Sequence, residues 1–263
     1  MTPEMSEFLR LAPLGFAVGA YGTLVGAGGG SVLVPALLIL LPHETPATIT
    51  AISLGVVFFN AYSGTIAYMR MGRIDYRTAV LFTIASLPGA IIGALLVHKI
   101  PRGIFDPLFG VVLLGLRALL VVFPVARLTS ELPEPDVSRS WRGSLVGSIG
   151  SGYIAIFSSL LGIGGGIIHV PFLIHFLRQS AHRATATSHF VLTFMALTAT
   201  VTHVVTGEFN RGLAQTMYLS VGVLMGAPLG AALSTKLQGS LIVRLLAVAL
   251  SLVGARLLAR VFL

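Results

Sequence analysis

Two glycine runs are the residues of this sequence whose types and spacing could do chemistry. Residues 26–30 read Gly-Ala-Gly-Gly-Gly, residues 162–166 read Gly-Ile-Gly-Gly-Gly, and a proline follows each run five residues later. Glycine adopts backbone conformations that other residues avoid and lets a ligand approach the main chain closely. A helix that begins after such a run offers free N–H groups and a positive dipole end to an anion. The pattern therefore predicts a cradle of backbone amides for a small oxyanion.

Hydroxyl side chains could complete this cradle. Most Ser and Thr residues in apolar helices only bond a carbonyl one turn back, but Ser53 and Ser188 occupy matching places after the two runs. Thr50, Asn60 and Thr185 are further polar residues of the same segments. The predicted substrate-binding residues are Gly28, Gly29, Gly30, Ser31, Ser53, Gly164, Gly165, Gly166, Ile167, Thr187 and Ser188.

Three histidines lie inside apolar runs, at His169, His189 and His203. A neutral histidine bonded to a neighbouring helix is one interpretation of each. The other is a proton carrier, because an imidazole changes charge near neutral pH. We keep both interpretations open for all three.

Enzymatic motifs are weak. Ser151 lies between two glycines, as in intramembrane serine hydrolases, but Ile149 stands where a G-x-S-G pattern requires glycine. The first glycine run resembles a phosphate loop without its Lys-Ser/Thr ending. The sequence lacks a His-x3-His pair with a Glu, which is the pattern that would predict a zinc site. We therefore expect that the protein binds no metal and no cofactor and is not an enzyme.

The composition indicates the class of fold that must position these residues. Of 263 residues, 55% are hydrophobic and only 10% are charged, and the mean hydropathy is +0.93. Soluble domains carry about 25% charged residues, so the sequence predicts an all-α polytopic membrane protein instead. The absence of cysteine excludes disulfides and thiol chemistry. The net charge of +8 comes from residues between apolar runs, which indicates membrane topology rather than nucleic-acid binding.

The carboxylates argue against a cation as substrate. An Asp or Glu within the membrane usually marks a cation pathway, whereas all nine lie in a terminus, a connector or a segment edge. They are Glu4, Glu7, Glu44, Asp75, Asp106, Glu131, Glu134, Asp136 and Glu208.

Ten apolar segments can be marked along the chain. They cover residues 8–24, 31–41, 46–69, 78–97, 103–123, 143–161, 167–177, 184–206, 212–235 and 239–262. Crossing about 30 Å of hydrocarbon takes about 20 residues, so 31–41 and 167–177 are too short to span alone. The first apolar run follows Glu4 and Glu7, which predicts a span rather than a cleavable signal peptide.

The sequence consists of two halves that repeat each other. We predict halves at 1–126 and 143–263, joined by a polar linker at 127–142. Residues 24–35 match 160–171 at an offset of 136, and later landmarks match in the same order at offsets of 135 and 137. Several ordered matches make a strong repeat signal. Gly89, Gly93, Gly226 and Gly230 are predicted to serve close helix packing only.

Each glycine run must interrupt a helix. An unbroken helix over 8–41 would be roughly 50 Å long, too long for one crossing and too short for two. We predict broken or re-entrant pairs, and irregular backbone in a membrane must face protein or water. Paired breaks in two halves indicate a transporter binding site.

Two topologies remain possible. Five segments per half give inverted repeats with both termini outside, which we prefer, and four spans per half give parallel repeats with both termini inside. The positive-inside rule does not separate them, because the basic residues split eleven to six in either case. In the inverted topology the eleven are Arg70, Arg73, Arg77, Arg117, Arg127, Arg139, Arg142, Arg178, Arg183, Lys236 and Arg244.

The doubled G-x-GGG-x4-P pattern, the Ala-Thr-Ser run at residues 186–188 and the glycines at 72 and 207 resemble the TauE/SafE sulfite exporter family. The resemblance covers residues 10–260 and implies a carrier for small sulfur-containing anions in a bacterial or archaeal inner membrane. The glycine motif falls on residues 26–35 and 162–171. The first half reads Ala-Ile-Ser at 51–53, so the middle hydroxyl of Thr187 has no counterpart there.

The leading interpretation is a secondary transporter that exports sulfite, sulfoacetate or another organosulfonate by alternating access, with possible coupling to protons. The alternatives are an anion channel, a carrier for a non-sulfur anion and, remotely, an intramembrane hydrolase. The expected partners are the small anion and membrane lipid, without nucleic acid. The sequence leaves the oligomeric state open, with a homodimer as one alternative.

Overall fold

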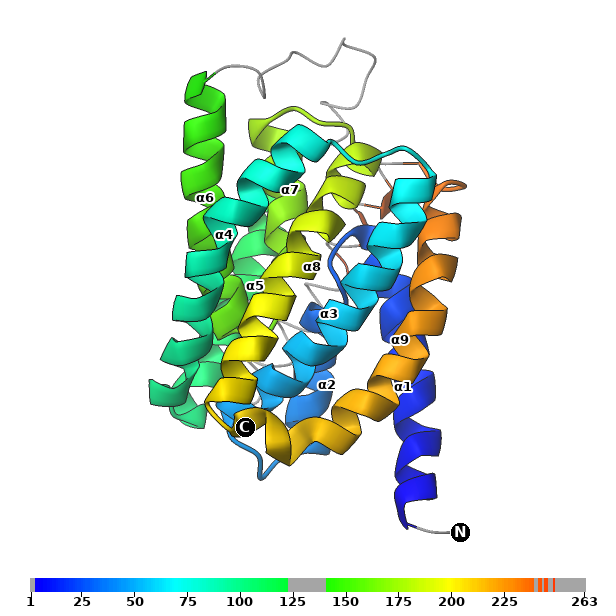
Figure 1. Ribbon diagram of the computed structural model, residues 1–263, viewed down its shortest axis with the longest axis vertical. Helices are drawn as coiled ribbons and strands as arrows, with labels where there is room; N and C mark the ends of the chain where they lie inside the picture. The colour runs from blue at the N-terminus through cyan, green and yellow to red at the C-terminus, as the bar shows by residue number, and fades with distance from the viewer. Residues whose placement is uncertain (1–2, 123–140, 239–240, 243, 246–247, 249–263) are drawn as a thin grey trace.

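The structure is a computed structural model that describes residues 3–122 and 141–238, together with 241–242, 244–245 and 248. The predicted linker at 127–142 lies outside the described residues except for its last two. Within these ranges the secondary structure is helical (Figure 1). The α-helices are α1 (Pro3–Val25), α2 (Gly30–Leu40), α3 (Pro46–Arg70), α4 (Tyr76–Leu96), α5 (Arg102–Val122), α6 (Trp141–Leu160), α7 (Gly166–Phe176), α8 (Ala181–Val205) and α9 (Leu213–Ser234). Two short 3-10 turns, η1 (Val97–Lys99) and η4 (Glu208–Gly212), connect them.

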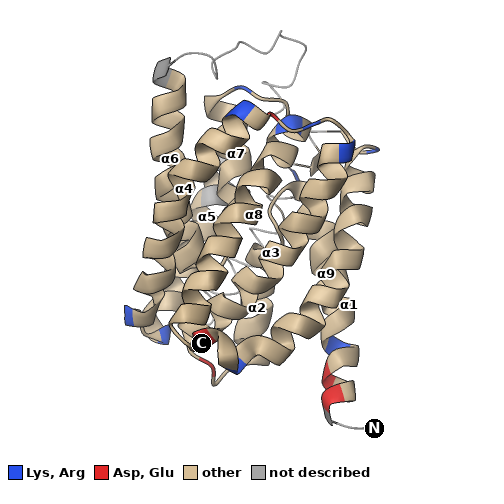
Figure 2. Ribbon diagram, viewed as in Figure 1, with Lys and Arg blue, Asp and Glu red and all other residues tan. Residues whose placement is uncertain are grey.

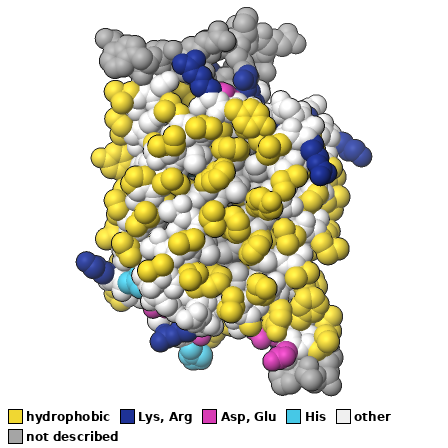
Figure 3. Space-filling view, in the orientation of Figure 1, with side chains coloured by type: hydrophobic (Ala, Val, Ile, Leu, Met, Phe, Trp, Pro, Cys, Tyr) yellow, Lys and Arg dark blue, Asp and Glu magenta, His cyan; other side chains and the backbone are white. Residues whose placement is uncertain are grey.

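Six of the described helical segments are long and apolar enough to cross a membrane. They are Glu4–Val25, Pro46–Arg70, Tyr76–Lys99, Gly143–Leu160, Ala181–Val205 and Glu208–Ser234. Charged residues gather at the two ends of the bundle, and apolar side chains cover the face between them (Figures 2 and 3). The chain is therefore a multi-pass integral membrane protein. The two segments predicted to be too short are α2 and α7, of 11 residues each.

Local sequence explains where the central helices begin. Thr45 precedes α3 and its side chain accepts a hydrogen bond from the Thr48 amide at 3.2 Å, with Pro46 in the first helical position. Asp75 caps α4 in the same way through the Thr78 amide. Such caps satisfy amides that have no acceptor within the helix.

The long helices pair across the two predicted halves. α1 lies along α9, α4 lies along α6, and α3 and α8 cross in the middle (Figure 1). In Figure 1, α1 runs upward and α6 downward, so these corresponding helices point in opposite directions. α3 and α8 also have equal lengths of 25 residues.

Small residues permit this close pairing. A Cβ added to Gly89 or Gly93 would strike carbonyls of α6, and one added to Gly226 or Gly230 would strike carbonyls of α1. The predicted packing role of these four glycines is confirmed. Apolar side chains alone would not hold helices together in lipid, so backbone approach of this kind matters for association.

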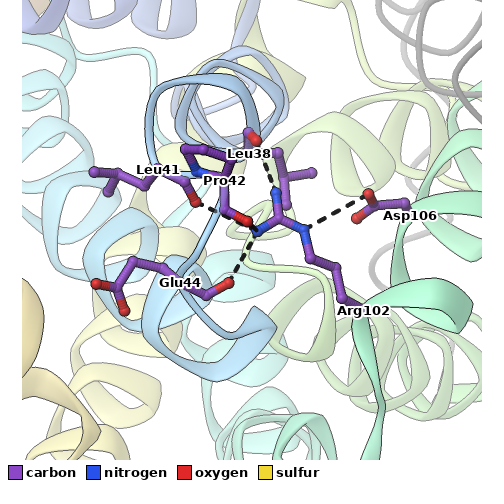
Figure 4. A network of polar contacts seen from close by, with 6 residues as sticks. All are labelled: Leu38, Leu41, Pro42, Glu44, Arg102 and Asp106. Atoms are coloured by element: carbon purple, nitrogen blue, oxygen red, sulfur yellow. Dashed lines mark hydrogen bonds and ion pairs between the residues drawn. The ribbon is translucent and has the colours of Figure 1, made fainter.

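Arg102 closes the lower end of the bundle (Figure 4). Its guanidinium donates to the carbonyls of Leu38 at 2.7 Å, Glu44 at 3.0 Å, Leu41 and Pro42, and its Nε lies 3.8 Å from an Asp106 carboxylate oxygen. These carbonyls belong to the last turn of α2 and the loop after it. The arginine therefore satisfies carbonyls that a helix end leaves without donors.

Replacing Arg102 with Gln is expected to lower the free energy of unfolding by about 2 kcal/mol, because several carbonyls lose a charged donor. Thermal unfolding of the purified protein in detergent measures the change. The control is Lys99→Gln, which removes the same charge from an exposed neighbour and should leave the midpoint unchanged. Equal stability of both variants would contradict the role given to Arg102.

Candidate functional site

Both glycine runs interrupt the helices as predicted. α1 ends at Val25 and α2 begins at Gly30, while α6 ends at Leu160 and α7 begins at Gly166. Three glycines of each run have positive φ, a region that side-chain-bearing residues rarely occupy. They are Gly26, Gly28, Gly29, Gly162, Gly164 and Gly165.

The two breaks touch each other. A Cβ added to Gly30 would lie 2.5 Å from the Ile163 carbonyl oxygen and 2.7 Å from that of Gly162. A Cβ added to Gly166 would strike the Gly26 carbonyl and lie 3.0 Å from the Ala27 Cα. The short helices α2 and α7 therefore each begin in contact with the irregular backbone of the opposite break.

Two serines cross-connect the breaks. The Ser53 hydroxyl on α3 donates to the Gly162 carbonyl at 2.7 Å, and the Ser188 hydroxyl on α8 donates to the Gly26 carbonyl at 3.3 Å. The repeat predicted that these serines are equivalent, and the structure places both on the first glycine of the opposite run. They hold irregular backbone in place rather than pointing a free hydroxyl at a solute.

Several amides at the breaks have no acceptor among the described residues. In the first run these are the N–H groups of residues 29–31, and in the second those of residues 164–167. The Gly28 amide differs from the prediction, because it donates to the Gly22 carbonyl at 3.1 Å. Free amides at two helix N-termini that begin side by side can hold a negative group.

The breaks are closed in this structure. Residues 22–31 and 160–167 are buried throughout. Val57 of α3 and Leu192 of α8 both lie where a Cβ on Gly28 or Gly164 would point. Val57 and Leu192, one from each half, together cover both glycine runs at Gly28 and Gly164. A solute therefore reaches the free amides only after these two side chains move.

The other predicted polar residues contact the first glycine of a run or a connection between helices. Thr187 accepts a hydrogen bond from the Asp75 amide at 3.1 Å, which fixes it to the connection between α3 and α4. Its counterpart, Ile52, packs against Gly212 at the connection before α9. Thr50 lies against Gly162, and Thr185 lies against Gly26.

The three buried histidines differ in their surroundings. His169 Nε2 is 2.9 Å from the Ser151 hydroxyl, and its Nδ1 is 3.1 Å from the Gly165 carbonyl. Both ring nitrogens of His203 lack a partner in the described part of the chain, and its ring lies 5.6 Å from that of His98. His189 has one partnered nitrogen, Nδ1, at 3.3 Å from the Thr185 carbonyl.

The pair of Ser151 and His169 brings a hydroxyl and an imidazole together in the interior. Both side chains are 0% exposed, and the Ser151 hydroxyl also donates to the Phe82 carbonyl at 3.0 Å. A nucleophile needs a base within reach, and this distance meets that condition. However, the hydroxyl is held by a main-chain carbonyl of α4, which ties α6, α7 and α4 together.

The sequence interpretation named Asn60 but missed its polar neighbours Thr23 and Tyr68 beside the first break. The Tyr68 hydroxyl donates to the Thr23 carbonyl at 2.7 Å, and the Thr23 hydroxyl donates to the Asn60 side chain at 3.1 Å. Asn60, Gly64 and Tyr68 are spaced by four residues, which places them on one face of α3. That spacing is the signal that could have found them.

The fold and the site together define a class: a multi-pass helical membrane protein with two interrupted helices that meet in its interior. The comparisons with known proteins assign the family. The family model "Sulfite exporter TauE/SafE" matches residues 11–257, and the chain belongs to this family of membrane transporters.

Two curated relatives with transporter names match over nearly their whole length, and a third matches over a quarter of its length. The "Probable membrane transporter protein YunE" of Bacillus subtilis is 30% identical over 96% of this chain and 97% of its own. The "Probable membrane transporter protein MJ0441" of Methanocaldococcus jannaschii is 25% identical over 88% and 90%. The "Sulfite exporter TauE/SafE family protein 5" of Arabidopsis thaliana is 29% identical over 48% of this chain and 25% of its own. No solved structure matches the chain.

Proposed function

We propose that this protein is a secondary transporter that exports a small sulfur-containing anion, such as sulfite, sulfoacetate or another organosulfonate, by alternating access. The single observation that carries the proposal is the meeting of two helix N-termini whose amides lack acceptors. Family membership supports a transported solute, and the printed names of the family and of one relative mention sulfite.

The charges of the interior favour an anion. Among the buried side chains of the described residues there is no Asp, Glu, Lys or Arg. A transported cation would need a negative partner in such a place. Backbone amides supply partial positive charge without a buried arginine.

The helix directions support inverted halves with the N-terminus outside. Basic residues gather at the upper end in Figure 2, where α3, α7 and α9 end and α4 and α8 begin. The positive-inside rule makes this end cytoplasmic. The connections at these helix ends contain Arg70, Arg73, Arg77, Arg178, Arg183 and Lys236, together with the acid Asp75.

Alternating access follows from this arrangement as part of the proposal. Inverted halves that meet at one site can rock so that the site opens to either side in turn. The structure corresponds to a closed state, since Val57 and Leu192 cover the breaks. At the lower end, a cavity of about 530 Å³ is lined by residues 42–47, 97–102 and Glu208, and we assign it to the outward route.

Ligand-dependent thermal stabilisation tests the proposal. A solute that binds only the folded protein stabilises it by RT ln(1 + [L]/Kd), so its unfolding temperature rises with the concentration of the solute. We expect sulfite or a sulfonate to stabilise the purified protein, and the panel is sulfite, thiosulfate, sulfoacetate, taurine and sulfate. Stabilisation by none of the five would overturn the proposed substrate class.

Trans-stimulation in proteoliposomes separates the carrier from the alternative of a channel. Unlabelled anion on the far side accelerates exchange of labelled anion through a carrier, because the loaded site returns faster than the empty one. A pore shows no such acceleration. Exchange at an unchanged rate would favour the channel.

The hydrolase alternative is tested at Ser151. We expect Ser151→Ala to transport at close to the wild-type rate and to lose about 1–2 kcal/mol of stability, because its hydroxyl bonds the Phe82 carbonyl. Uptake by proteoliposomes and thermal unfolding measure the two effects. Loss of all activity in a folded variant would instead support a catalytic serine.

A further inference from the structure

A cluster of buried polar side chains from α1, α3 and α8, called the pocket below, lies beside the first break, and Tyr68 also reaches Ser234 of α9. Its members are Thr23, Asn60, Tyr68 and His189, and all four are 0% exposed. Hydrogen bonds join Tyr68 to Thr23 and Thr23 to Asn60, and the rings of Tyr68 and His189 meet edge to face at 5.4 Å. The Thr23 carbonyl also accepts the Gly26 amide at 3.2 Å, so the pocket adjoins the break directly.

Two nitrogen atoms of this pocket lack a partner. Asn60 Nδ2 and His189 Nε2 are both buried with no hydrogen bond among the described residues. A Cβ added to Gly64 would lie 3.1 Å from His189 Nε2 and 2.9 Å from the methyl group of Thr23. The hydroxyl of the same threonine donates a hydrogen bond to the Asn60 side chain. His189 Nε2 therefore lies beside Gly64, and Asn60 lies one helical turn before Gly64 on the same face of α3. The group is closely packed in this structure, because the added Cβ would also lie 2.7 Å from His189 Cδ2, so a solute enters only after these side chains move. Burying such groups unpaired costs free energy, which a bound acceptor would recover.

The other half differs at the residues that carry the two nitrogens. At the repeat offset of 135, Asn60 corresponds to Met195, Gly64 to Ala199, and Leu54 to His189. Thr23 and Tyr68 correspond to the polar residues Ser159, at an offset of 136, and His203. The combination of an amide with an imidazole is therefore specific to the first break.

The hydrogen bond of His189 determines which of its two ring nitrogens carries the hydrogen in the neutral form. Nδ1 faces the Thr185 carbonyl at 3.3 Å, so Nδ1 carries the hydrogen in the neutral ring. Nε2 then has a lone pair, which repels an oxyanion. An oxyanion oxygen can therefore bind at Nε2 only when this nitrogen carries a proton, which it donates to the oxygen.

We propose that Asn60 and His189 bind the transported oxyanion together with one proton, which makes this pocket the site where anion and proton movements are coupled. This inference rests on the proposed function. The proton adds to the Nε2 lone pair, so the imidazole becomes an imidazolium whose Nε2–H donates to one anion oxygen. Asn60 Nδ2 donates to another. When the anion leaves, the proton leaves Nε2 and the ring returns to its neutral form.

The surroundings of the pocket favour an anion. One guanidinium nitrogen of Arg73, in the connection between α3 and α4, is buried without a partner in the described chain. A cation at the end of the bundle that we propose to be cytoplasmic raises the local concentration of anions. The titratable and charged groups on the helices around His189, which are α1, α3, α8 and α9, include one in ring contact with it, Tyr68. The others on these helices are Glu4, Glu7, Arg10, Tyr21, Tyr62, Arg70, His182, Arg183, His203 and Tyr218.

The experiment measures anion binding to the purified full chain across pH. The probes are sulfoacetate and sulfate, because their charge stays constant between about pH 6 and pH 8 while an imidazole titrates. We expect wild-type affinity to fall by up to about tenfold per pH unit on the alkaline side. Calorimetry in two buffers of different ionisation enthalpy should count one proton taken up per anion bound.

Three variants locate the effect. His189→Gln keeps a polar side chain that cannot titrate and should abolish both the pH slope and the proton uptake. Asn60→Leu should weaken binding about tenfold at every pH, as expected for one lost donor, and keep the slope. His175→Gln makes the same chemical change on α7, outside the pocket, and should behave like wild type.

The outcomes separate this inference from the function on which it rests. Binding of the probes without proton uptake, or a pH slope that persists in His189→Gln, would refute the inference and leave anion transport standing. Wild-type protein that binds neither probe nor sulfite at any pH would refute both. If His189→Gln does not fold, the proton count of the wild type decides alone.

Discussion

Gly30→Ala and Gly166→Ala are expected to abolish transport while the protein still inserts into the membrane. Each added methyl would point at backbone carbonyls of the opposite break, at 2.5 Å from Ile163 in the case of Gly30. Main-chain atoms cannot move aside as a flexible side chain can, so the two halves must separate. Both residues are helical without positive φ, so the contact with the opposite break is the cause.

Uptake of labelled anion into proteoliposomes measures this effect, and we expect a fall of at least about tenfold, the change that 1.4 kcal/mol in a barrier produces. Membrane fractionation verifies insertion. The control is Gly103→Ala in the first turn of α5, where an added methyl meets nothing within 4 Å. Transport at the wild-type rate by both break variants would show that the contact between the breaks is not needed.

Ser53→Ala and Ser188→Ala are expected to destabilise the breaks, and the double variant more than either. Each change leaves a buried carbonyl, of Gly162 or Gly26, without its donor, which costs about 1–3 kcal/mol. Ser53→Ala should cost more, because its hydrogen bond is 2.7 Å long against 3.3 Å for Ser188. Transport should fall together with stability, since the free amides depend on the same backbone.

Thermal unfolding of the three variants, with uptake assays beside it, measures these changes. Thr198→Ala on α8 is the control, because its exposed hydroxyl bonds only the Phe194 carbonyl one turn back in its own helix. We expect it to match wild type. A double variant that is as stable as the wild type would contradict the role of the serines.

Sequence alone could predict the helices and the breaks. Lipid requires long apolar helices, and three consecutive glycines are incompatible with an unbroken helix, so α1, α2, α6 and α7 follow from local chemistry. The repeat also singled out Ser53 and Ser188 as a matched pair. These features depend on residue type and spacing within one segment.

The partners across the interface could not be predicted in this way. That Ser53 binds the opposite run, that Thr187 binds the Asp75 amide, and that His169 faces Ser151 are consequences of how the halves pack. A sequence pattern fixes which face of a helix is apolar but not which residue of a distant helix meets it. The pocket at Asn60 and His189 was missed as a unit for this reason.

The short length of α2 and α7 has a consequence for the membrane potential. Each helix has 11 residues, or about 16 Å at 1.5 Å per residue, roughly half of the hydrocarbon thickness. An anion at their first residues, as proposed, therefore lies part-way through the electric field. Voltage performs work of about 2.3 kcal/mol per charge per 100 mV over the full thickness. A proton that travels with a monovalent anion cancels that work, so transport of the pair becomes independent of voltage.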